Sequence, residues 1–136
     1  MPLINWTNTF SVGVEVLDDD HKQLFGLVNE LYDGIEAGQA KEPIGKALDR
    51  LVEYTNTHFS REERLFASTS YAAASAHKGE HDELIGQMIA LQQEFKDGTS
   101  PTLPNDVMRF LKTWLVHHIL GSDRKYGPHL NEHGVQ

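Results

Sequence analysis

The chain has 136 residues, 39% hydrophobic residues, a formal net charge of −8 and no cysteine. This length fits a single domain with one hydrophobic core. The lack of cysteine excludes disulfides, iron–sulfur clusters and thiolate metal sites, and the acidic charge argues against a nucleic-acid partner, because phosphate binding needs clustered Lys and Arg.

The apolar segments of the chain are short. None approaches the roughly 20 residues that a membrane-spanning helix requires, so we expect no membrane insertion. The N-terminus lacks the basic segment and apolar run of a secretion signal, which favours a cytoplasmic location. No large apolar surface is evident from the pattern, so we expect a monomer.

The first helix is expected to follow an irregular arm at residues 1–17. Asp18 or Asp19 is a suitable N-cap, and Gly38 can end the helix. Between them, apolar residues recur at intervals of three and four, which is typical of one buried helix face. These residues are Leu24, Phe25, Val28, Leu31, Tyr32 and Ile35.

The same periodicity predicts three further helices at residues 43–66, 72–96 and 107–119. Residues 67–71 break the pattern, and residues 97–104 are rich in Gly and Pro, so both segments are expected to be connections. Four amphipathic helices with short connections favour an all-α, up-down-up-down four-helix bundle. We therefore expect one domain, with the bundle at residues 18–130 and a tail at 131–136.

Polar residues interrupt the apolar face of every predicted helix. Unpaired polar groups in a core cost about 1–3 kcal/mol each, and a buried carboxylate costs more unless a cation compensates it. The residues concerned are His21, His58, Glu62, His77, His81 and His118. One such histidine alone is most simply a core residue bonded to a backbone carbonyl. Packing alone does not explain five histidines around one bundle axis. Binding of two metal ions would explain them, because imidazole is a common metal ligand.

The spacings of these residues are those of metal ligands. His58 with Glu62, and His77 with His81, are four residues apart and so lie on the same helix face. Asp123 follows His118 by five residues, which is off-face in an ideal helix. The intervening Gly-Ser step could loosen the turn and bring Asp123 inward. No Glu-x-x-His occurs in the chain, which argues against the ferritin-like di-iron carboxylate arrangement.

Taken in order, these motifs closely resemble the hemerythrin family, specifically its single-domain bacterial members, over nearly the whole chain. The matching residues are Trp6, the segments 11–14, 17–25, 58–63, 77–81 and 114–119, Asp123 and Tyr126.

The resemblance implies a non-heme centre of two iron ions (Fe²⁺/Fe³⁺) with an oxo or hydroxo bridge. It assigns His77, His81 and His118 to one iron, and His21 and His58 to the other. Glu62 and Asp123 would bridge the two irons, and one position would stay open for dioxygen. Leu115, Ile119, Trp114 and Phe59 are the expected walls of the oxygen pocket.

The function implied is reversible dioxygen binding for storage, transport or delivery, without enzymatic turnover. Two alternatives stay open: an oxygen or redox sensor acting through a partner, and a di-iron enzyme acting on peroxide or nitric oxide. A third, weaker alternative comes from residues 77–81, which match the H-x-x-E-H motif of zinc peptidases, with Glu80 as general base. That motif leaves the other candidate ligands unexplained.

The remaining polar residues near these motifs have less direct roles. Glu63 and His117 are each rotated about 100° from a candidate ligand, so we place them outside the site. Asp18 is expected to cap its helix, and the Tyr126 hydroxyl to reach a bridging carboxylate. His129 and His133 are expected on the surface, in a polar tail beyond Pro128.

Overall fold

The computed structural model describes residues 3–98 and 103–136, with side chains from residue 105 in the second range. Its helices are η1 (Asn8–Phe10), α1 (Glu15–Glu36), α2 (Lys41–Thr69), α3 (Ala74–Asp97), α4 (Leu103–His117), the π-helix η2 (His118–Asp123) and α5 (Arg124–Glu132).

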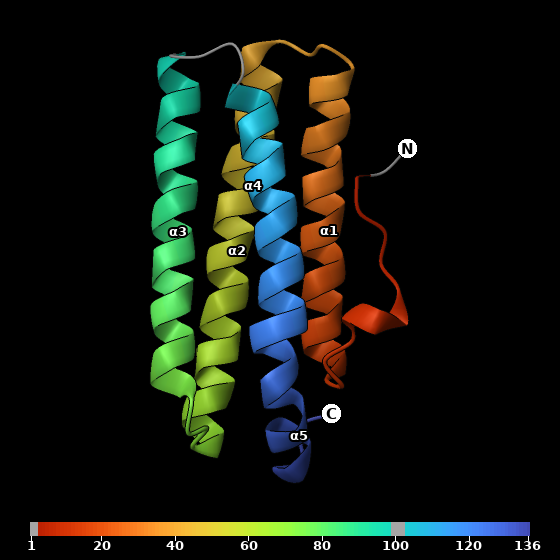
Figure 1. Ribbon diagram of the computed structural model, residues 1–136, viewed down its shortest axis with the longest axis vertical. Coiled ribbons are helices and arrows are strands. Elements are labelled where there is room, and N and C mark those ends of the chain that lie inside the picture. Colours follow the sequence, from red (N-terminus) through yellow and green to blue (C-terminus); the bar gives the residue numbers. More distant parts are fainter. Residues whose placement is uncertain (1–2, 99–102) are drawn as a thin grey trace.

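The four long helices stand side by side, and consecutive ones run in opposite directions (Figure 1). Contacts join α1 to α2, α2 to α3, α3 to α4, and α4 back to α1. This closed order confirms the predicted all-α, up-down-up-down bundle. Within the described residues, no helix combines the length and apolar character needed to cross a membrane.

The core follows the apolar stripes of the sequence. Buried residues recur at helical spacing along α1 and α2 and along the inner face of α4. The predicted residues Leu24, Phe25, Val28 and Leu31 are all buried, whereas Tyr32 and Ile35 are only partly buried. Burial of such a continuous apolar face, at about 25 cal/mol per Å², is the main stabilising term of a small bundle.

The arm packs against the outer side of α1. Trp6, Phe10 and Phe25 form an aromatic cluster with ring centroids 5.0–5.9 Å apart. Asn29 holds the backbone of Ile4 through hydrogen bonds to its N–H (3.0 Å) and its carbonyl (2.7 Å). The arm is thus fixed to the bundle although most of it is irregular.

The first helix begins earlier than the sequence predicted. α1 starts at Glu15 with Val14 as N-cap, and no side chain caps it. The expected capping role of Asp18 is therefore wrong. Its carboxylate instead accepts hydrogen bonds from the Ser11 hydroxyl (2.6 Å) and the Val12 N–H (2.8 Å), and so ties the arm to the helix. Gly38 adopts φ +69° in the turn after α1, as its predicted role as terminator requires.

The predicted connections are shorter than expected. α2 continues to Thr69, and the Ser68 and Thr69 hydroxyls are accommodated there by donating to the Leu65 carbonyl inside the helix (3.0 and 2.7 Å). The left-handed conformation at Ser70 (φ 54°) then ends α2. α3 ends at Asp97, and α4 begins at Leu103; residues 99–102 of the second predicted connection lie outside the described residues.

The C-terminal end also differs from the predicted polar tail. The chain stays helical past Pro128, and α5 reaches Glu132. Leu130 is completely buried, and the His129 Nε2 atom lies 3.0 Å from the Thr69 carbonyl at the end of α2. His129 is therefore partly buried against α2 rather than free on the surface as expected, whereas His133 is exposed.

Gly127 provides a direct test of how the arm and α5 fit together. A Cβ atom at this position would lie 2.1 Å from the Val12 carbonyl oxygen. We expect Gly127→Ala to lower the free energy of unfolding by about 1–3 kcal/mol, because the arm must shift. Gly86→Ala is the matched control: it lies inside α3 with nothing within 4 Å of the added Cβ, and should stabilise the helix by about 0.5–1 kcal/mol. Chemical denaturation of both variants checks this, and equal effects would contradict the close approach.

Candidate metal centre

The bundle interior holds a cluster of polar side chains from α1, α2, α3 and the π-helix η2 that follows α4. Every member is buried, and none exceeds 4% exposure. The cluster forms two groups that share both carboxylates. The first contains Glu62, His77, His81, His118 and Asp123, and the second contains His21, His58, Glu62 and Asp123. The structure thus brings all seven predicted ligand residues together.

Helical spacing explains most of this convergence. His58 and Glu62 stand one turn apart on α2, with the His58 Nε2 atom 3.1 Å from a Glu62 oxygen. His77 and His81 have the same relation on α3, and their rings lie 4.5 Å apart. Residues at i and i+4 face the same side of a helix, so each pair enters the interior together.

Asp123 reaches the site through a change of helix type. In an α-helix, five residues correspond to 500° of rotation, which would turn Asp123 about 140° away from His118. Residues 118–123 instead form a π-helix, whose i to i+5 repeat brings both residues to one face. The His118 Nε2 atom lies 2.9 Å from Asp123 Oδ1. The predicted inward turn of Asp123 therefore occurs within a continuous helix rather than at a frayed helix end.

The two carboxylates lie between the two groups of histidines. Asp123 Oδ1 lies 3.0 Å from His77 Nε2 and 2.9 Å from His118 Nε2, whereas Asp123 Oδ2 lies 3.0 Å from His21 Nε2. Each oxygen of Asp123 thus faces a different group.

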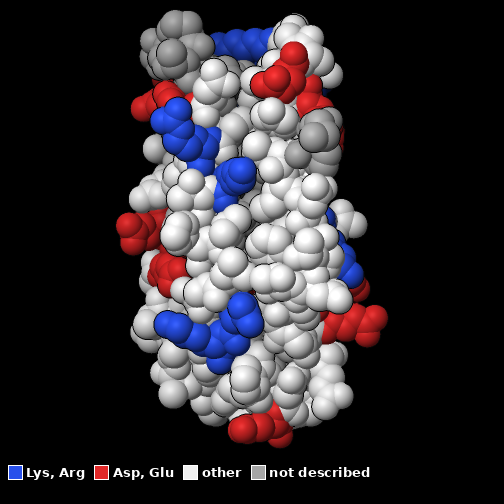
Figure 2. Space-filling view, turned by 45° about the vertical axis from the view of Figure 1, so that its right-hand side comes forward, with Lys and Arg blue, Asp and Glu red and all other residues white. Residues whose placement is uncertain are grey.

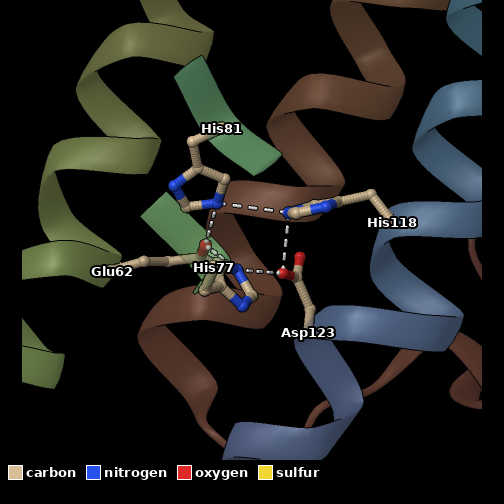
Figure 3. A group of neighbouring side chains, drawn as sticks. All are labelled: Glu62, His77, His81, His118 and Asp123. Atoms are coloured by element: carbon tan, nitrogen blue, oxygen red, sulfur yellow. Dashed lines mark hydrogen bonds and ion pairs between the residues drawn. The ribbon is translucent and has the colours of Figure 1, made fainter. Parts of the chain in front are cut away.

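Glu62 has the same divided arrangement. Its Oε1 atom lies 3.0 Å from His81 Nε2 and 3.3 Å from His77 Nε2 (Figure 3). Its Oε2 atom lies 3.1 Å from His58 Nε2 and 3.7 Å from His21 Nε2. A carboxylate with one oxygen toward each of two histidine groups has the geometry of a bridge between two cations.

Three of the histidines are held from outside by further carboxylates. His58 Nδ1 lies 2.8 Å from Asp20, His81 Nδ1 lies 3.0 Å from Glu63, and His118 Nδ1 lies 2.7 Å from Glu80. A carboxylate accepts hydrogen bonds, so each Nδ1 carries the proton and each Nε2 directs a lone pair inward. The sequence pattern does not indicate this role for Asp20, because Asp20 holds a histidine on a neighbouring helix and shares no helical spacing with it.

The inward nitrogen atoms cannot satisfy one another. His81 Nε2 and His118 Nε2 lie 3.2 Å apart, and both direct lone pairs into the site when their Nδ1 atoms donate to Glu63 and Glu80. Further atoms in the site are buried without a hydrogen-bond partner: His21 Nε2, His58 Nε2, His77 Nε2, Glu62 Oε1 and both oxygens of Asp123. Imidazole nitrogen and carboxylate oxygen are the donors that iron and similar metals prefer, so this set fits bound metal cations.

Without a metal, protons take the place of the cations. Burial alone lowers the pKa of His21 and of His77, but the attraction of the close carboxylates of Asp123 and Glu62 outweighs it and raises each pKa to about 9. Burial likewise raises the pKa values of Glu62 and Asp123, yet the surrounding histidines hold both well below the ordinary range. The site therefore favours positive charge, whether protons or metal cations supply it.

Tyr126 contacts the site from α5. It is completely buried, and its hydroxyl donates a hydrogen bond of 2.5 Å to Glu62 Oε2. The predicted contact with a bridging carboxylate is thus present. The hydrogen bond orients Glu62 and partly neutralises the oxygen that faces His21 and His58.

The four residues predicted to line an oxygen pocket are all buried. The Phe59 ring stacks on His81 at 3.7 Å, and the Trp114 ring lies 5.9 Å from Phe59 and 6.2 Å from His118. Both aromatic rings therefore cover the three-histidine group. Leu115 and Ile119 belong to the same core, and their contact with dioxygen stays a prediction.

The residues placed outside the site lie outside it. His117 is exposed, and Glu63 reaches only the outer nitrogen of His81. Glu80, the general base of the zinc-peptidase alternative, bonds to the outer nitrogen of His118 and to Ser122. It is not directed toward the inward nitrogens of His77 and His81, which argues against that alternative.

Comparisons with known proteins agree with this geometry. Residues 12–130 match the family described as the Hemerythrin HHE cation binding domain. The chain is 42% identical to a bacteriohemerythrin of Methylococcus capsulatus, covering 96% of this chain and 99% of that protein. It is 34% identical to a hemerythrin-like protein of Naegleria gruberi over 90% of this chain and 89% of that one. A crystal structure of wild-type hemerythrin superimposes with a TM-score of 0.87 at 41% identity, covering 94% of this chain and 98% of that one.

The pKa shifts predict an unusual pH dependence for the metal-free protein. Because His21 and His77 have pKa values of about 9, raised from 6.5, their contribution to stability is complete below pH 6.5 and is lost as the pH rises to about 9. Because Glu62 and Asp123 have lowered pKa values, their contribution is lost as the pH falls below about 4. Metal affinity should rise between pH 6.5 and 9, since metal displaces these protons. Thermal unfolding of the metal-free protein and metal titrations at several pH values check both trends; stability that rises from pH 6.5 to 9 would contradict this charge arrangement.

Proposed function

This chain belongs to the hemerythrin family, and we propose that it binds dioxygen reversibly at a pair of iron ions, for storage, transport or delivery. The observation that supports this most directly is the divided arrangement of Glu62 and Asp123. Each directs one oxygen to the three-histidine group and the other to the two-histidine group. A site for one ion would not need carboxylates that face two ways.

The side chains divide into two sets of ligands under this proposal. His77, His81 and His118 would hold one iron, and His21 and His58 the other. Glu62 and Asp123 would bridge them together with an oxo or hydroxo group. The ion held by His21 and His58 would have one histidine ligand fewer than the other, so dioxygen is expected to bind there. Two ferrous ions held by these residues would supply the two electrons that dioxygen takes up when it binds.

The surrounding residues keep this site rigid and dry. Asp20, Glu63 and Glu80 fix the rings of His58, His81 and His118 through their Nδ1 atoms, which preserves the inward lone pairs. All four predicted wall residues are buried: Phe59 and Trp114 would shield the three-histidine group from water, and Leu115 and Ile119 are the walls expected beside the bound oxygen. Water entry promotes irreversible oxidation of such a site, so exclusion is what makes release possible.

A carrier, rather than an enzyme, is part of the same proposal. The carboxylates and imidazoles that surround the inward-facing atoms all serve as candidate ligands or hold one in place, so none of these is left to act as an acid or base toward a substrate. Monomeric state and cytoplasmic location stay predictions.

The first test is optical. The protein reduced to the ferrous form should gain a charge-transfer band in air and lose it under vacuum, through several cycles. Metal analysis of the same samples should give two irons per chain. One iron per chain, or bleaching to an oxidised form that vacuum does not reverse, would count against a carrier.

The second test removes one ligand. His58→Ala should lower iron content and abolish the coloured adduct, because the two-histidine iron would keep a single imidazole. His117→Ala is the matched control, since this histidine is exposed and next in sequence to a proposed ligand. Iron analysis of both folded variants, verified by circular dichroism, decides the outcome. Full iron content in His58→Ala would show that the ligand assignment is wrong.

A further inference from the structure

Glu80 is the one residue of the H-x-x-E-H motif that the proposed metal site does not use as a ligand. It lies on α3 between His77 and His81, and its side chain is 40% exposed. One carboxylate makes three contacts. Oε1 lies 2.7 Å from His118 Nδ1, and the Ser122 hydroxyl lies 2.7 Å from Oε1 and 2.8 Å from Oε2.

All three contacts are with two residues of the π-helix η2, His118 and Ser122. His118 is its first residue and Ser122 precedes its last, Asp123. A π-helix is rare compared with the α-helix, and return to α-helical geometry would turn Asp123 out of the site. Some interaction must therefore hold η2 in register. Glu80, on the neighbouring helix α3, forms hydrogen bonds near both ends of η2.

The same carboxylate also sets the state of His118. The Nδ1 proton of His118 donates to Glu80, which leaves the Nε2 lone pair facing Asp123 Oδ1 at 2.9 Å and His81 Nε2 at 3.2 Å. Hydrogen bonds of this kind fix the ring orientation and tautomer of metal-binding histidines.

The other two outer carboxylates act differently. Among the described residues, Glu63 forms a hydrogen bond with His81 only. Asp20 bonds to His58, Tyr54 and Arg61, all on α2. Neither touches η2, so Glu80 combines two tasks that the others do not share.

We propose that Glu80 is a positioning residue that clamps η2 to α3, and so holds both the inward nitrogen of His118 and the inward carboxylate of Asp123. This inference rests on the proposed metal site but not on dioxygen binding. It gives the glutamate of the H-x-x-E-H motif a structural task in place of the general-base role.

The test compares three variants with one control. Glu80→Ala removes the clamp, and Ser122→Ala removes only its contact at the far end of η2. Glu80→Gln keeps an oxygen that can accept from His118 Nδ1 and an amide that can donate to Ser122. Glu83→Ala is the control, because it removes one negative charge from an exposed position on the same helix.

Two measurements separate the clamp from a general loss of stability. The first is the rate at which iron passes from the loaded protein to a chelator, and the second is hydrogen–deuterium exchange of backbone amides at residues 118–123. Glu80→Ala should release iron about tenfold faster or more and should exchange faster at residues 118–123. Glu80→Gln should largely restore both values, and Ser122→Ala should raise exchange there with a smaller effect on iron release.

The proposal is overturned if Glu80→Ala matches Glu83→Ala in both measurements. Faster iron release with unchanged exchange at residues 118–123 would also overturn the clamp. Failure of the proposed function can be distinguished from failure of the clamp. A protein that binds iron but not dioxygen still allows both iron release and hydrogen–deuterium exchange to be measured. A protein that binds no iron still allows the exchange comparison in its metal-free form.

Discussion

The structure depends on one electrostatic constraint: two carboxylates and five imidazoles are buried together where water cannot solvate them. Carboxylates in such surroundings require compensating positive charge. The inward nitrogens of His81 and His118, 3.2 Å apart, make the same demand, because two lone pairs repel unless a cation lies between them. Protons can meet this demand in part, which is why His21 and His77 have raised pKa values. Metal ions meet it for the whole cluster.

This constraint links metal binding to folding. The apolar stripes supply the general stability of the bundle, whereas the polar cluster opposes it until its charges are balanced. A ligand that binds only the folded state adds to its stability, so the metal-loaded protein should be more stable than the metal-free one. Local structure is adapted to the same end. The π-helix at residues 118–123 gives up regular helix geometry to bring Asp123 inward.

The residues outside the cluster convert a set of donors into a defined geometry. Asp20, Glu63 and Glu80 each hold the outer nitrogen of one imidazole, and Tyr126 holds Glu62. Asp20 is itself bonded by Tyr54 and Arg61, so the arrangement extends from the interior to the surface of α2. Such outer contacts commonly decide metal affinity as strongly as the ligands do.

The sequence alone determined the fold class and the set of residues that meet in the interior. Helical periodicity assigns each residue to a helix face, and His21, His58, Glu62, His77, His81 and His118 all fall on apolar faces. Tertiary structure decided what periodicity cannot express. The outer contacts of Asp20 and Glu80 join different helices, the cap predicted at Asp18 became a tie to the arm, and the expected tail packs against α2 through His129. Spacing along one helix specifies direction around its axis, but a contact between helices depends on how deeply and at what height they pack, and only the folded chain sets those distances.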